Sequence, residues 1–182
     1  VVKLLLNYSD PNIDLNASDN FGYTAFMYAC SRGHKDVVQL LLDHFERIEL
    51  NARTIDGWTA YMQACQKRHK DVVKLLLYHY AKIELNARNN YGWTAFMWAC
   101  ANRHKDVAKL LLDHSNPNID LNVGSFTGMT AILHACKNGH KDIVQLLLDH
   151  SERIDPNTRC NGGSTAFMWA CYKGHKDVVK LL

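Results

Sequence analysis

The chain has 182 residues, which is enough for one domain with a buried core. Hydrophobic residues make up 47% and charged residues 21%, and the net charge of +3 is too small to indicate a nucleic-acid or anionic-membrane partner by itself. No apolar run approaches the roughly 20 residues of a membrane helix, and no signal peptide is recognisable, so a membrane-spanning protein is not expected.

One phrase recurs along the chain, and its third copy reads GWTAFMWACANRHKDVAKLLLDH. Its threonine falls at Thr24, Thr59, Thr94, Thr130 and Thr165, at spacings of 35, 35, 36 and 35 residues. Both ends of the sequence match part of the phrase, which predicts a fragment cut inside a repeat at each end. We expect a single repeat domain over 1–182, with partial repeats at 1–21 and 163–182 and full repeats at 22–56, 57–91, 92–127 and 128–162.

Within residues 22–56, Thr24 is expected to cap a short first helix, and Gly33 is expected to end it in the left-handed conformation. A second helix is predicted through HKDVVQLLLDH, where apolar residues recur at helical spacing. The segment RIELNARTIDG then predicts an extended connection with a tight turn at Asp56 and Gly57. One such unit cannot bury its apolar side alone, so the units are expected to stack.

These residues resemble the ankyrin repeat, whose family phrase is G-x-T-P-L-H-x-A-A-x-x-G-H-L-E-V-V-K-L-L-L with a later asparagine. The residues that fall on it in register are Gly22, Thr24, Ala29, Gly33, His34, Val37, Val38, Leu40, Leu41, Leu42 and Asn51. The resemblance covers essentially the whole chain and implies an all-α ankyrin-repeat solenoid, with helix-turn-helix-hairpin units stacked into a curved array. A tetratricopeptide array, with a period of 34, is the rival interpretation, but it lacks the glycine-rich hairpin that recurs here.

The chain departs from the family phrase in three ways. Alanine replaces the family proline at Ala25, Ala60, Ala95, Ala131 and Ala166. A packing contact is expected to replace the family's threonine-histidine hydrogen bond, because apolar residues stand at Met27, Met62, Met97, Leu133 and Met168. Each repeat is also longer than the common 33 residues, and the extra length precedes the asparagine.

Each copy contains a cysteine followed four residues later by a histidine, which raises the question of a metal or catalytic site. The periodic cysteines, which are expected to be buried, are Cys30, Cys65, Cys100, Cys136 and Cys171. Neighbouring repeats stack roughly 8–10 Å apart, whereas zinc holds a sulfur at about 2.3 Å, so the ladder cannot converge on one ion. A nucleophile pair would be unique, whereas this pair repeats with the fold.

No catalytic residue, metal or cofactor is therefore expected. Core thiols without a disulfide framework indicate a reducing compartment, either the cytoplasm or the nucleus, or a host cytosol if the array is viral or a bacterial effector. Cys160 lies outside the period and is expected to be the exposed thiol.

Recognition is expected where the repeats differ: after the turn glycine, along and at the end of the first helix, and at the hairpin tip. In the family these columns line the concave groove and the fingertips, and Tyr, Trp and Arg are enriched in interface hot spots. The predicted partner-binding residues are Tyr23, Tyr28, Arg53, Trp58, Arg88, Tyr91, Trp93, Trp98, Arg103 and Trp169. Trp58 and Trp93 are expected to be exposed, while both a contact role and a core role stay open for Tyr28, Trp98 and Trp169.

Arginine stands at two positions where the other repeats have the helix-stop glycine. These residues are Arg68 and Arg103, and a left-handed conformation there is expected to cost about 1 kcal/mol each. They could also contribute to a binding patch that includes Arg53 and Arg88.

The expected function is that of a non-catalytic scaffold that binds another protein through its concave face and hairpin tips. Nucleic-acid binding through an Arg/Lys/Trp surface is the alternative, although each repeated lysine has an acidic neighbour. A third interpretation makes the chain the recognition arm of a larger multidomain protein. The uncapped ends, VVKLLL at residues 1–6 and the helix that stops at Leu182, also predict head-to-tail self-association.

Overall fold

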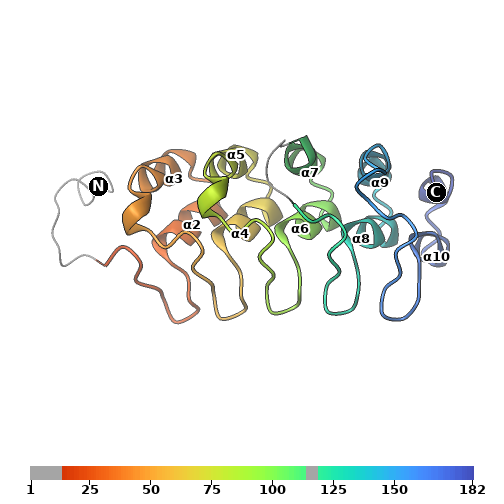
Figure 1. The fold of residues 1–182 in the computed structure, drawn as a ribbon, viewed down its shortest axis with the longest axis horizontal. Helices are drawn as coiled ribbons and strands as arrows, with labels where there is room; N and C mark the ends of the chain where they lie inside the picture. Colours follow the sequence, from red (N-terminus) through yellow and green to blue (C-terminus); the bar gives the residue numbers. More distant parts are fainter. Residues whose placement is uncertain (1–13, 114–118) are drawn as a thin grey trace. The chain divides into compact units, whose positions relative to one another are not determined.

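The computed structural model describes residues 14–113 and 119–182, and the chain divides into two compact units, Val1–Glu84 and Leu85–Leu182. The described residues form short helices and loops, with no strand beyond a single bridge between Ser18 and Thr24. Figure 1 shows that each unit is built from pairs of helices followed by long loops. The first-helix segment VVKLLL, on which the self-association prediction partly depends, lies outside the described residues.

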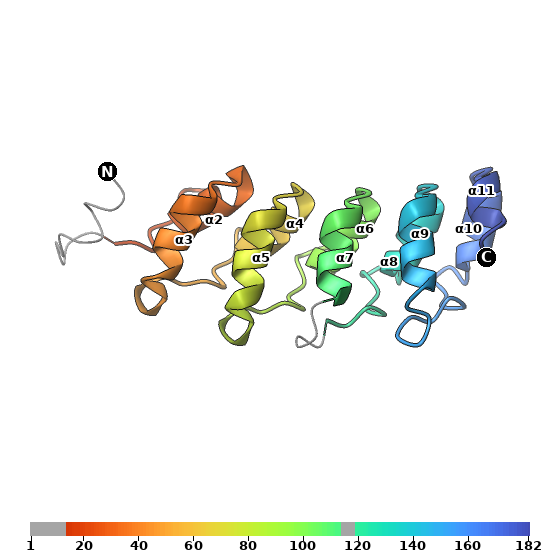
Figure 2. The same cartoon turned by 90° about the horizontal axis from the view of Figure 1, so that it is seen from above.

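The described part of the first unit contains two pairs of α-helices, each followed by one turn of 3-10 helix. Its elements are α2 (Ala25–Arg32), α3 (Lys35–Leu42), η1 (Phe45–Arg47), α4 (Ala60–Gln66), α5 (Lys70–Tyr78) and η2 (Tyr80–Lys82). The first helices α2 and α4 pack on each other, and the second helices α3 and α5 pack on each other (Figure 2). The residues by which each repeat exceeds 33 lie in the segments that contain η1 and η2.

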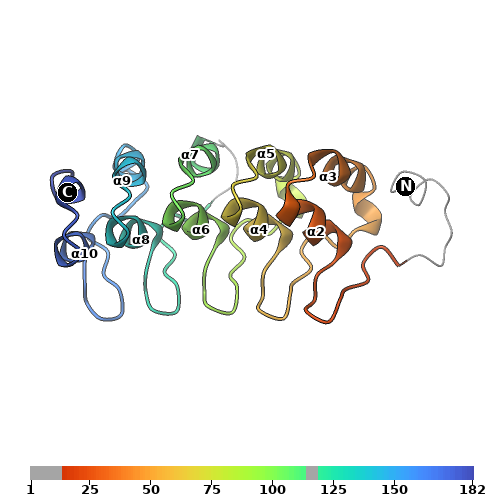
Figure 3. The same ribbon diagram turned by 180° about the vertical axis from the view of Figure 1, so that it is seen from behind.

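The second unit repeats this arrangement with three helix pairs. Its elements are α6 (Ala95–Ala101), α7 (Lys105–Asp113), α8 (Ala131–Lys137), α9 (Lys141–Leu148), α10 (Ala166–Tyr172) and α11 (Lys176–Val179). The first helices α6, α8 and α10 pack in sequence order, as do the second helices α7, α9 and α11 (Figure 3). The predicted helix-turn-helix-hairpin repeat is therefore confirmed in each unit taken by itself.

A threonine precedes every first helix of the described chain, as predicted. In four of the five, the threonine side chain accepts a hydrogen bond from the backbone amide three residues later, at 3.3 Å. Thr130 is the exception, because its side chain makes no capping bond, although it still precedes α8. The cap fixes where each first helix starts without the family proline.

The predicted left-handed stops are also confirmed. Gly33 has φ 72°, and the two arginines that replace the glycine, Arg68 and Arg103, have φ 62° and 60°. A backbone at positive φ suits glycine because a Cβ crowds the following carbonyl oxygen. The chain therefore keeps the same turn at the two arginines instead of finding another one.

Asparagine side chains form hydrogen bonds between the loop of one repeat and the loop of the following repeat. The Nδ2 atom of Asn51 donates to the carbonyl oxygen of Lys82 at 2.9 Å, and its Oδ1 atom accepts from the amide of Glu84 at 2.9 Å. Asn16 makes the same pair of bonds with Arg47 and Glu49. The asparagine of one repeat thus fixes the loop of the following repeat.

The cores lie between the helix layers, and four of the five periodic cysteines are buried there, as predicted. The prediction is wrong for Cys171, which is exposed together with Phe167 and Met168 of the same helix α10. The equivalent positions of the other four described first helices are buried. Among the described first helices, α10 alone therefore has these three positions accessible.

Candidate functional site

The first aromatic group of the candidate site lies in the first unit, where a hairpin loop meets helix α2. The rings of Tyr23 and Tyr28 are stacked, with centroids 5.1 Å apart and planes at 30°. The Tyr28 hydroxyl donates to Oδ2 of Asp19 at 2.6 Å, which lowers the pKa of the Asp19 carboxyl and raises the pKa of Tyr28. Asp19 Oδ1 also accepts from the amides of Phe21 and Tyr23, so this carboxylate shapes the hairpin and positions the Tyr28 ring.

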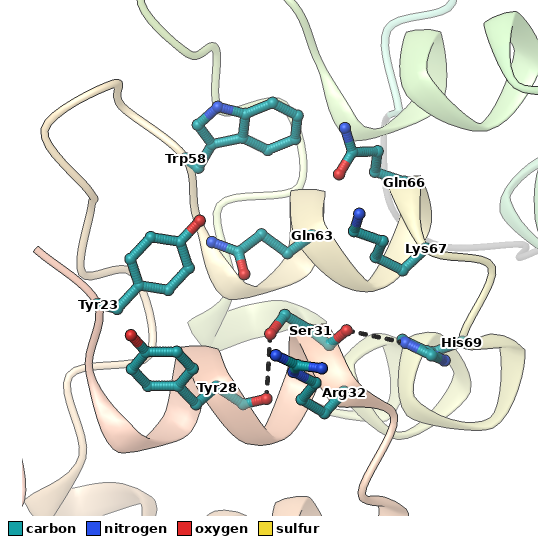
Figure 4. Close-up of a pocket in the computed structure, with 9 residues that line it drawn as sticks. All are labelled: Tyr23, Tyr28, Ser31, Arg32, Trp58, Gln63, Gln66, Lys67 and His69. Atoms are coloured by element: carbon teal, nitrogen blue, oxygen red, sulfur yellow. Dashed lines mark hydrogen bonds between the residues drawn. The ribbon is translucent and has the colours of Figure 1, made fainter. Parts of the chain in front are cut away.

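These two tyrosines form one end of a cavity of about 760 Å³ in front of helices α2 and α4 (Figure 4). Trp58, from the next hairpin, lies at its upper edge in that view, and Gln63 of α4 lies at its centre. The far end carries Arg32 and Lys67, at the ends of the two first helices. Three of the predicted binding residues, Tyr23, Tyr28 and Trp58, therefore come together.

Gln63 is 4% exposed, and neither its amide nitrogen nor its amide oxygen has a hydrogen-bond partner among the described residues. Gln63 and the neighbouring cations Arg32 and Lys67 were not among the predicted partner-binding residues. These residues could have been found because they stand at repeat positions that vary between the repeats. At the position of Gln63, for example, the other repeats have tyrosine, tryptophan or histidine.

A second aromatic group lies in the second unit. The Trp93 ring packs against Trp98, at a centroid distance of 4.2 Å, and against His134 of α8, at 4.1 Å. Burial, with a smaller contribution from the positive charge of Lys137, lowers the pKa of His134 to about 4. The imidazole is therefore neutral near pH 7 and packs as an aromatic ring between repeats.

This arrangement corrects the prediction that Trp58 and Trp93 are exposed. Both are half-buried, and at Trp93 the neighbouring rings of Trp98 and His134 account for part of this burial. Of the three residues that were left open, Tyr28 is 46% exposed, whereas Trp98 and Trp169 are half-buried. Trp169 packs under the ammonium group of Lys137, which lies 4.7 Å from its ring centroid.

The predicted arginines are held by the fold. Arg53 pairs with Glu84 at 2.9 Å, and Arg103 pairs with Asp142 at 2.9 Å. Arg88 donates to the carbonyl oxygens of Gly92 and Gly124, at 3.2 and 2.7 Å, and its guanidinium lies 5.4 Å from the centroid of the Phe126 ring. Arg88 is therefore a connector of two hairpin loops as well as an exposed side chain.

Hairpin tips carry the most exposed aromatic side chains of the predicted surface. Tyr91 is 58% exposed, and Phe21, Ile55 and Phe126 at other tips are each more than 60% exposed. Within each unit, neighbouring tips are joined by backbone hydrogen bonds, as between Ile55 and Phe21 at 3.0 Å. The tips thus form an ordered edge.

Three of the histidines that follow the periodic cysteines contact backbone carbonyl oxygens of the preceding repeat. Nε2 of His69 lies 2.9 Å from the carbonyl oxygen of Ser31, and His140 and His175 make the equivalent contacts with Ala101 and Lys137. Burial raises the pKa of the Cys30, Cys65 and Cys100 thiols far above the usual range, which suppresses the reactive thiolate. Across residues 14–113 and 119–182, no group of three His, Cys, Asp or Glu side chains is placed to hold a metal ion.

No helix within the described parts of the chain is both long enough and apolar enough to cross a membrane. A family model described as ankyrin repeats (3 copies) matches residues 1–89, 48–125 and 117–182. No curated protein matches the chain.

Proposed function

The chain belongs to the ankyrin-repeat family, and we propose that it binds a partner protein through its first helices and hairpin tips, without catalysing a reaction. Its fold is the all-α ankyrin solenoid. Ankyrin repeats generally serve as protein-protein interaction modules, and the proteins that contain them are typically non-catalytic scaffolds. What is specific to this chain is the surface and the residues that make the contact.

The observation that supports this surface is the concentration of variable aromatic side chains on it. Tyr28 and Tyr91 are exposed there, and the cavity of the first unit opens among Tyr23, Tyr28 and Trp58. Rigid aromatic side chains give a large contact area at a low entropic cost, which is why they dominate interface hot spots. The second helices instead present mixed charge, such as Lys35, Asp36 and Lys74.

Site-specific photo-crosslinking tests the proposal without depending on a destabilising mutation. Benzoylphenylalanine replaces Tyr28 on the first helix or Tyr91 at a hairpin tip, and replaces the 83%-exposed Tyr78 of α5 as the matched control. In cells that express the full-length protein, we expect ultraviolet-dependent adducts with one protein from the first two positions and none from Tyr78. Adducts from Tyr78 alone would refute the proposed surface, and adducts sensitive to nuclease but not to protease would indicate a nucleic-acid partner.

A further inference from the structure

The cavity in front of α2 and α4 has a polarity that indicates the chemistry of its ligand. Figure 4 shows Tyr23, Tyr28 and Trp58 on one side and the side chains of Arg32 and Lys67 on the other. The aromatic side can pack on an apolar side chain, and the other side presents two positive charges. Because these ends belong to one continuous cavity of about 760 Å³, a ligand that fills it contacts both.

The cations are available for a ligand. Arg32 and Lys67 are exposed, and neither forms an ion pair among the residues that the structure describes. No aspartate or glutamate lines the cavity. The nearest carboxylate at the aromatic end, Asp19, is already bound by the Tyr28 hydroxyl and by two backbone amides. The positive charge of the cavity is therefore not neutralised internally, which favours an anionic group.

Gln63 supplies a second and independent indication. Its amide lies between the aromatic and cationic ends, and both polar atoms are buried without a partner in the described chain. An unpartnered buried amide is costly, and a ligand that offers one donor and one acceptor removes that cost. A backbone peptide group offers this combination, with an N–H and a C=O.

We propose that this cavity binds an extended segment of the partner protein that carries an acidic side chain. Gln63 hydrogen-bonds a backbone peptide group of the segment, and Arg32 and Lys67 bind its carboxylate. An apolar neighbour of the acidic residue packs against Tyr23, Tyr28 and Trp58. This inference rests on the proposed function, because it specifies the partner chemistry at one part of the proposed surface.

A single-stranded nucleic acid would also present negative charge and flat rings to such a cavity. The peptide is favoured because Gln63 lies at the centre and matches a peptide group, whereas only two cations are present to follow a phosphate backbone. The experiment below therefore also measures nucleic-acid binding, so that it can distinguish the two ligands.

The test begins with a random linear peptide library displayed on phage and selected on the immobilised 182-residue chain. Enriched peptides are then synthesised with a fluorescent label, and their affinity is measured by anisotropy. The variants compared are the pair Arg32→Gln and Lys67→Gln, the single change Gln63→Leu, and a control pair, Arg47→Gln and Lys70→Gln. The control removes two exposed cations of the same unit that do not line the cavity.

We expect Asp or Glu at one fixed position of the enriched peptides. The Arg32/Lys67 pair should weaken binding by about tenfold or more, and the control pair should leave it unchanged. Replacing the acidic peptide residue by its amide should cost a similar factor with the unaltered chain and little with the Arg32/Lys67 pair. Gln63→Leu should weaken binding by about threefold to tenfold while the chain stays folded, because leucine fills a similar volume without an unpaired amide.

Enriched peptides without an acidic residue, equal losses with the control pair, or the absence of any enriched peptide would overturn the inference. So would a labelled oligothymidylate whose affinity falls with the same Arg32/Lys67 pair, since the cations would then serve phosphate groups. The proposed function is judged separately. Adducts from Tyr28 or Tyr91 to a partner protein, combined with failure of the peptide test, would retain protein binding and reject this ligand chemistry.

Discussion

The imidazole ring of His69 covers Gly33, the residue that ends the first helix of the preceding repeat. Its Nε2 atom lies 2.9 Å from the carbonyl oxygen of Ser31, and a Cβ added to Gly33 would lie 2.5 Å from its Nδ1 atom. Glycine is therefore favoured at this position for two reasons: its φ of 72° and the ring that packs on it. Gly174 has nearly the same φ, 71°, with nothing within 4 Å of an added Cβ.

Alanine at these two glycines should separate the two reasons. Gly174→Ala should lower the free energy of unfolding by about 1 kcal/mol, the cost of a side chain at positive φ. Gly33→Ala should lower it by on the order of 2 kcal/mol, because the His69 ring must also shift and weaken its hydrogen bond. Urea unfolding measures both. Equal losses would mean that the His69 ring makes room for the added methyl group without a measurable cost.

Arg103 combines an unfavourable backbone conformation with a favourable ion pair. Relief of its φ of 60° should stabilise Arg103→Gly by about 1 kcal/mol, while loss of the exposed pair with Asp142 should cost about 0–1 kcal/mol. The gain should therefore be larger in an Asp142→Asn background than in the unaltered chain. A double-mutant cycle by urea unfolding gives both terms, and destabilisation by Arg103→Gly in both backgrounds would show that the arginine makes further stabilising contacts.

Asn51 should be more important for stability than the equivalent residue of the last repeat. Asn51→Ala removes two hydrogen bonds between adjacent loops and should cost about 1–2 kcal/mol. Asn157 stands at the same repeat position, and its side chain has no partner among the described residues, so Asn157→Ala should change stability by less than about 0.5 kcal/mol. Thermal unfolding of both variants checks the comparison, which fails if the two losses are alike.

His134 should lower the stability of the folded chain at acidic pH. Its pKa is about 4 in the folded chain and near 6.5 when unfolded, so between these values the unfolded state binds the extra proton. Stability from this residue is present above pH 6.5 and is lost as the pH falls towards 4, by up to roughly 3 kcal/mol.

The measurement compares the loss in unfolding free energy between pH 7 and pH 4.5 for the unaltered chain and for His134→Gln. Glutamine is chosen because another repeat has a glutamine, Gln63, at the same position. The variant should lose less, and His34→Gln, at an exposed histidine, should behave like the unaltered chain. Identical losses for all three chains would show that His134 does not control the acid response.

Thiol chemistry should distinguish two cysteines from the other four. Burial raises the pKa of the half-buried Cys160 thiol, but hydrogen bonds with the Ser164 and Gly162 backbone lower this pKa by more, so that it falls below its usual value. Cys171 is exposed. Burial raises the pKa of Cys136 to about 12, and Cys30, Cys65 and Cys100 are also buried. Ellman's reagent at pH 8 should therefore react promptly with two thiols and reach all six only in denaturant. A single prompt thiol would restore the expectation that Cys160 alone is accessible.

The periodic part of the fold could be predicted because each repeated residue performs a local task. A threonine three residues before a free amide caps four of the five described first helices, and a residue at positive φ ends each of them. Cys171 could not be assigned in this way, because its burial depends on a following repeat and not on its own helix. Trp93 was misjudged for a related reason: the ring that covers it, His134, comes from the next repeat and is not periodic.

The candidate site was predicted in part. The two columns that contain Tyr23 and Tyr28 were found from variation between repeats, but the central residue of the cavity, Gln63, was not singled out. A glutamine in a sequence gives no sign of whether its amide is partnered, and the hydrogen-bond inventory of a cavity is known only from the positions of its neighbours. The contacts of the arginines could not be predicted either, because the carbonyl oxygens that an exposed guanidinium reaches, as at Arg88, depend on the positions of neighbouring loops.

The asparagine contacts have a consequence for how such a chain can change over generations. Asn16, Asn51 and Asn122 each donate to a carbonyl 31 residues later and accept from an amide 33 residues later. Copying or deleting one whole repeat by recombination preserves both separations. One additional residue between the partners is also tolerated, because Asn86 accepts from the amide of Asp120, 34 residues later. The gene can therefore vary the length of the array in whole units without designing a new junction, and point mutation is left to diversify the columns that these bonds do not use.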